Sequence, residues 1–157
     1  MTGDRREAHR MLDRAATVLS GPATPVPSPW VSHFDEASLA SDAARSLRVL
    51  GDHRAAAEWT QRIIALRPRG TRSRALAQVT LAATLIDQGH LDQACAAAED
   101  AIDGIDEVNS HLLTRQLRGV ATQLLPYRST ATVRQCADQL ETVICERTSM
   151  HRSADTL

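Results

Sequence analysis

Histidines and cysteines are the side chains best able to bind a metal or act as nucleophiles, and the chain has six and three of them. The histidines form no HxxxH or HExxH pattern and the cysteines form no CxxC pair, so no two ligands are set on one face. No GxSxG nucleophile motif occurs, and no glycine-rich loop suited to phosphate follows a strand. An active site would have to be assembled from residues distant in sequence. The sequence therefore predicts a non-catalytic protein with no cofactor and no metal.

Pairs of arginines on predicted helices could hold a partner instead. Arg45 and Arg48 lie three positions apart, so they share one helical face. Arginines spaced in this way can hold a carboxylate or an acidic peptide by bidentate hydrogen bonds. The alternative is a pair of exposed arginines with acidic side chains nearby.

Two aromatic residues, Trp30 and Phe34, lie close together in a chain that is only 3% aromatic. They stand at the end of the proline-rich stretch 21–33 and just after it. Either they fill the gap between a first helix and the repeat that follows, or they line a ligand pocket.

Apolar residues at helical spacing predict the elements that position these side chains. The stripe of Ala8, Leu12 and Ala15 predicts a helix over 3–20 whose exposed side is a contact surface. The prolines of the next stretch predict a stiff, extended crossing. One domain over 1–146 is expected, with that helix, the crossing 21–33, repeats at 37–70 and 75–107, a terminal helix pair at 108–146, and a disordered tail at 147–157.

Composition excludes several classes of function. The net charge is -1 and the sequence pI is about 6.6, so no global field attracts nucleic acid or anionic lipid. Three cysteines without a pairing pattern indicate free thiols in a reducing compartment. No apolar run is long enough to cross a membrane, and the start has no secretory pattern. We expect a cytoplasmic protein with no direct contact to nucleic acid or membrane.

Residues 37–70 have the pattern of two helices joined by a tight turn. Small Ala44 lies where the first helix must let the second come close, and Gly51 ends that helix. Ala56 is the small contact of the second helix, and Pro68 closes the unit. The stretch resembles one tetratricopeptide (TPR) repeat, a helix–turn–helix unit of about 34 residues.

A second copy follows at 75–107, although Asp106 stands where a proline is usual. Neither copy has the large aromatic residues of the repeat consensus. The positions that correspond to those of the first copy are Ala82, Gly89, Ala94, Ala98 and Ala101.

A wider pattern extends over about residues 1–145. It is similar to the C-terminal TPR region of actinobacterial helix-turn-helix (XRE-type) transcriptional regulators, which handles dimerisation or signal input. The chain has no room for a DNA-binding domain before residue 1, so DNA binding is not expected. The residues that carry this resemblance are Pro29-Trp30, Phe34-Asp35, Gly51 and Arg72-Ser73-Arg74-Ala75.

The TPR resemblance implies an all-α, right-handed superhelix of helical hairpins with about seven helices. It also implies that the first helix of each repeat lines a concave face. On that face we expect Ser41, Arg45 and Arg48, then Val79, Ala83 and Ile86, then Arg115 and Arg118.

The sequence thus predicts a TPR scaffold that binds a protein or peptide partner, has a regulatory role and forms a homodimer through 3–20. One alternative is a sensor of a small molecule or peptide, and another is a fragment of a longer regulator. The residues predicted to bind a partner are Trp30, Phe34, Arg45, Arg48, Arg115 and Arg118.

Overall fold

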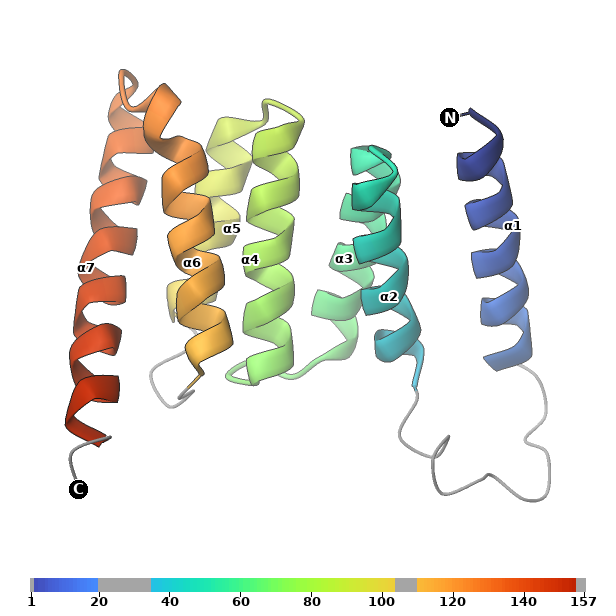
Figure 1. Cartoon of the computed structure of the whole chain (residues 1–157), viewed down its shortest axis with the longest axis horizontal. Coiled ribbons are helices and arrows are strands. Elements are labelled where there is room, and N and C mark those ends of the chain that lie inside the picture. Colours follow the sequence, from blue (N-terminus) through green and yellow to red (C-terminus); the bar gives the residue numbers. More distant parts are fainter. Residues whose placement is uncertain (1, 20–34, 104–109, 155–157) are drawn as a thin grey trace. The chain divides into compact units, whose positions relative to one another are not determined.

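The computed structural model describes residues 2–19, 35–103 and 110–154 of the chain. In these residues it contains seven α-helices, one short 3₁₀ helix and no strand, so the predicted all-α class with about seven helices is confirmed. The chain divides into two compact units, residues 1–66 and 67–157. The helices are α1 (Thr2–Leu19), α2 (Glu36–Val49), α3 (His53–Leu66), α4 (Arg72–Asp87), α5 (Leu91–Asp103), α6 (His111–Leu124), η1 (Leu125–Tyr127) and α7 (Ala131–Ala154) (Figure 1).

The first helix of each hairpin begins at a side-chain cap. The side chains of Asp35, Thr71 and Ser110 accept hydrogen bonds from the backbone N–H three residues later, at the starts of α2, α4 and α6. Each cap satisfies an amide that the first turn of a helix leaves without a partner. The start of each of these helices is therefore fixed by the residue that directly precedes it.

The turns of the α2–α3 and α4–α5 hairpins have the same construction. Gly51 has φ +72° and Gly89 has φ +80°, the left-handed conformation that a Cβ atom disfavours. The amide after each glycine donates back across the turn, from Asp52 to the Leu47 carbonyl at 2.8 Å and from His90 to the Leu85 carbonyl at 2.9 Å. This is a Schellman motif. It recurs after 38 positions and reverses the chain sharply both times.

Alanine makes most of the helix-to-helix contact in both hairpins. Ala44 and Ala82, separated by the same 38 positions, are 2% and 0% exposed, and Ala56 and Ala94 are each 1% exposed. Small side chains let two backbones approach closely, so the core is formed by close packing rather than by large rings.

Helix α1 packs against the α2–α3 hairpin within the first unit. Leu12 and Trp59 pack against a buried cluster of Leu47, Ala55 and Ala56. The stripe Ala8, Leu12, Ala15 is half-buried, so the expectation that it forms an exposed contact surface is wrong. The hairpin core, completed by Trp59, gives this stripe an apolar surface to cover.

Polar contacts fix the register of α1 on the hairpin turn. The Arg5 Nε–H donates to the Leu50 carbonyl at 2.9 Å, which satisfies a carbonyl at the end of α2. The His9 Nε2–H donates to Asp52 Oδ2 at 3.0 Å. This hydrogen bond holds the pKa of Asp52 below its usual value, with help from the Ala55 amide and the Arg5 charge and against the effect of burial.

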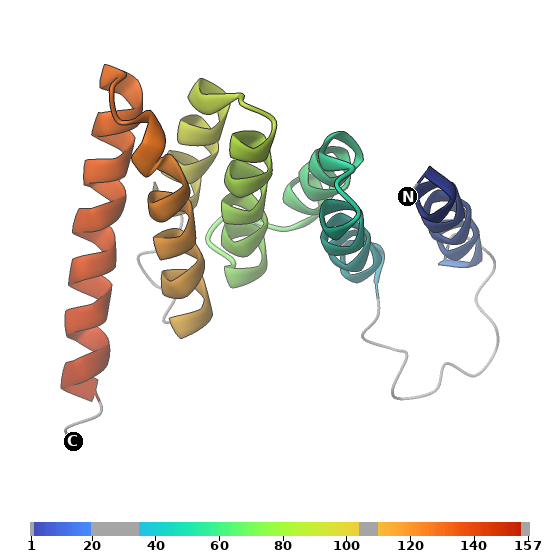
Figure 2. The same cartoon turned by 45° about the horizontal axis from the view of Figure 1, so that its top comes forward.

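The second unit consists of two stacked hairpins. Besides the contacts within each hairpin, α4 packs against α6 and α5 packs against α7, which gives two layers of helices (Figure 2). Because α5 and α6 both cover α4, that helix is buried around most of its circumference. Val79, Ala83 and Ile86, expected on an open concave face, are therefore 2%, 7% and 6% exposed.

Helix α7 continues to Ala154, so the disordered tail expected from residue 147 is wrong for 147–154. Arg147 is 7% exposed, and its Nε–H donates to Thr114 Oγ1 of α6 at 3.2 Å. The Thr114 hydroxyl in turn donates to the Ser110 carbonyl at 3.3 Å. This buried polar chain stabilises the last turns, where the apolar periodicity has ended.

Two glycines of the second unit should respond to alanine in opposite directions. Gly89→Ala places a Cβ at positive φ and should lower the free energy of unfolding by about 1–2 kcal/mol. Gly119→Ala, in the middle of α6 with open space around the added Cβ, should raise it by about 0.5–1 kcal/mol. Urea unfolding of both variants measures this, and a Gly89→Ala variant as stable as the unmodified chain would contradict the assigned turn.

Acid should remove the contribution of Asp52 to the stability of the first unit. A carboxyl with a lowered pKa in the folded state stabilises the fold above its unfolded pKa, and this contribution is lost as the pH falls through the folded pKa. Asp52→Asn keeps a residue that caps helices well. In a Trp30→Phe background, unfolding followed by Trp59 fluorescence should separate the two proteins at about pH 5. The difference should shrink as the pH falls below about 3.9, the ordinary pKa of an aspartate. A difference that does not change over this range would contradict the assigned pair.

Candidate functional site

A groove of about 330 Å³ lies between α6 and α7 in the second unit. Ala121 and Ile144 contribute apolar surface to it, and Leu125 remains 50% exposed at the end of α6. Its size falls at the lower end of the range of ligand sites. The lining residues are Arg118, Ala121, Thr122, Leu125, Glu141, Ile144, Cys145 and Thr148.

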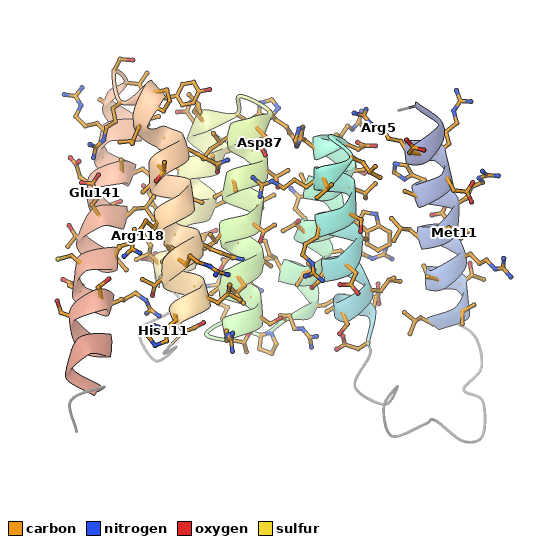
Figure 3. The ribbon with its side chains drawn as sticks, viewed as in Figure 1. Arg5, Met11, Asp87, His111, Arg118 and Glu141 are labelled. Carbon is orange, nitrogen blue, oxygen red and sulfur yellow. The ribbon has the colours of Figure 1, made fainter. Side chains whose placement is uncertain are left out.

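Opposite charges stand on the two walls of this groove (Figure 3). Arg118 of α6 is exposed, and its Nη2 donates to the Thr148 hydroxyl of α7 at 3.4 Å. Glu141 of α7 accepts a hydrogen bond from Arg128 Nη2 at 2.8 Å, and Asp138 accepts one from the same nitrogen at 3.0 Å. The arrangement offers an apolar patch between a donor of charge-assisted hydrogen bonds and an acceptor of them.

The only exposed thiol among the three belongs to Cys145, which lines the groove. Cys95 of α5 and Cys136 of α7 are buried and hydrogen-bond to each other. Burial raises the pKa of both thiols, so they stay protonated and unreactive.

The residues predicted to bind a partner are not brought together. Arg118 lines the groove, whereas Arg115 is exposed on α6 and does not line it. In the first unit, Arg45 is exposed and forms an ion pair with Asp42 one turn earlier, and Arg48 is half-buried. The ion pair with Asp42 fits the alternative of exposed arginines with acids nearby, and such pairs contribute little. Trp30, Phe34 and the crossing 21–33 lie outside the described residues.

Sequence reasoning missed Leu125, Glu141, Cys145 and Thr148 as residues of a groove. The predicted end of the last helix at 146 removed Thr148 from consideration. The other residues lack any motif, and only the pairing of α6 with α7 gathers them.

Comparison with protein-family models, with curated proteins and with solved structures gave no match. Among the described residues, no group of three or more His, Cys, Asp or Glu side chains is placed to hold a metal ion. In the same part of the chain, no helix has both the length and the hydropathy needed to cross a lipid bilayer.

Thiol labelling should distinguish the groove cysteine from the buried pair. In the native protein, a maleimide should react with one thiol per chain, and Cys145→Ser should abolish this reaction. Cys95 and Cys136 should react at least about a hundred times more slowly, because they need local unfolding. Mass spectrometry at short times measures the extent, and two or three rapidly labelled thiols would contradict the burial of the pair.

Proposed function

We propose that the chain is a non-catalytic scaffold of TPR type that binds a protein partner and acts by regulation through association. The regulatory role follows its sequence resemblance to the TPR regions of bacterial transcriptional regulators. Three free thiols fit a reducing, cytoplasmic location. The recurrence of one hairpin design, with Gly51 and Gly89 in the same conformation and the same hydrogen bonds around them, supports the repeat assignment.

The observation that carries the proposal is the α6–α7 groove, with an apolar patch between Arg118 and Glu141. A peptide would place an aliphatic or aromatic side chain over Ala121 and Ile144. It would present a carboxylate to Arg118 and a basic group to Glu141, which sets its direction in the groove. The exposed Leu125 would be covered by the same peptide.

The test selects peptides from a displayed random library against the purified full chain. Enriched peptides should carry an apolar residue flanked by one acidic and one basic residue. Arg118→Glu should weaken the best peptide about tenfold or more, because it puts like charges face to face. Arg115→Glu is the matched control, since Arg115 is an exposed arginine of the same helix that does not line the groove.

The selected peptide should also slow maleimide labelling of Cys145, which lines the groove. Enrichment of peptides whose affinity is equally insensitive to both arginine changes would contradict binding in this groove. A library that yields no enriched peptide would contradict the peptide-binding role itself.

A further inference from the structure

Acidic side chains are concentrated in one part of the chain. Between Arg74 and Arg115 the sequence has no arginine or lysine. The overall charge of -1 hides this segregation, because arginines elsewhere compensate it. The acidic residues of the stretch are Asp87, Asp92, Glu99, Asp100, Asp103, Asp106 and Glu107.

Part of this acidic stretch borders a second groove, between α5 and α7, of about 340 Å³. Glu99 and Asp103 lie four positions apart on α5, so they follow one another along the groove. Ile102 of α5 and Val143 of α7 are half-buried in the same groove and leave apolar surface accessible. The remaining lining residues are the uncharged Gln139 and Thr142, so the groove is acidic and partly apolar.

The outward face of α1 has the complementary chemistry. Arg10 and Arg14 are exposed and lie four positions apart, as Glu99 and Asp103 do. Met11 and Val18 lie on the same side of the helix and are 56% and 74% exposed. These four residues are exposed while Leu12 packs on the α2–α3 hairpin, so docking of α1 within the unit leaves this face accessible.

One contact competes for Arg10. Its Nη2 forms an ion pair with Glu7 on the surface of α1, where both side chains are more than half exposed. Exposed pairs of this kind contribute little, because water solvates both partners. Arg10 can therefore exchange Glu7 for an acid of another molecule.

We propose that the outward face of α1 in one copy of the chain docks in the acidic α5–α7 groove of a second copy. Arg10 and Arg14 pair with Glu99 and Asp103, and Met11 covers the apolar surface of the groove. The two surfaces differ, so the contact is head-to-tail. Every dimer therefore keeps one outward face of α1 and one α5–α7 groove unoccupied. Further copies can add at these surfaces until a ring closes or no unbound chain remains.

This self-association does not depend on the proposed peptide site. It uses the α5–α7 groove and the outward face of α1, whereas the peptide lies between α6 and α7. Either proposal can therefore fail alone.

Light scattering of the full chain over a dilution series tests the association. The weight-average mass should rise with concentration at about 50 mM salt and fall again at about 0.5 M, where charge pairs are screened. Two double variants remove one surface each. Arg10→Gln/Arg14→Gln removes the arginines of the outward face of α1, and Glu99→Gln/Asp103→Asn removes the acids of the α5–α7 groove. Each variant alone should be monomeric over the concentrations at which the unmodified chain associates, which corresponds to an association weakened at least about tenfold.

An equimolar mixture of the two double variants gives the decisive readout. The arginine variant keeps its α5–α7 groove, and the acid variant keeps the outward face of its α1. Only these two surfaces can still pair, so the mixture should stop at a 1:1 dimer. Asp92→Asn/Asp100→Asn, which changes two exposed acids of α5 outside the groove, should associate as the unmodified chain does. A wild-type chain that is monomeric at every concentration, or a mixture that stays monomeric, would overturn the proposal.

Discussion

The close approach of two alanine-lined helices is the interaction on which each hairpin depends. Ala44 and Ala56 in the first hairpin, and Ala82 and Ala94 in the second, are almost completely buried, and a larger side chain at any of them would force the helices apart. The approach also requires a chain reversal within a few residues, which the positive-φ glycines allow. The same combination of glycine turn and alanine contact recurs after 38 positions.

Stacking such hairpins creates the surfaces that a scaffold can use. In the second unit, α7 packs against both α5 and α6, and a groove follows each of these two seams. The two grooves differ in charge, because α5 has only acidic charged residues while α6 and α7 contribute both signs. The same helix therefore borders a mixed-charge groove and an acidic one.

The sequence was sufficient to predict the helical class, the glycine turns and the small contact residues, since each has a local cause. It misplaced the end of α7, because polar contacts of Arg147 with α6, rather than an apolar stripe, hold the last turns. It placed Val79, Ala83 and Ile86 on an open face, because their burial depends on α6 covering α4. The groove around Arg118 could not be predicted, since its residues come from two helices whose pairing no local pattern specifies. The acidic stretch between Arg74 and Arg115, by contrast, is readable from charge alone.

The proposed function depends on a peptide binding in the groove between α6 and α7. Amide hydrogen exchange of the full chain, with and without the selected peptide, tests it most directly, because it locates binding without any substitution. We expect slower exchange in the segments 118–125 and 141–148, with α2 and α3 unchanged. Protection confined to α2 and α3, or no change in α6 and α7 at saturating peptide, would contradict it.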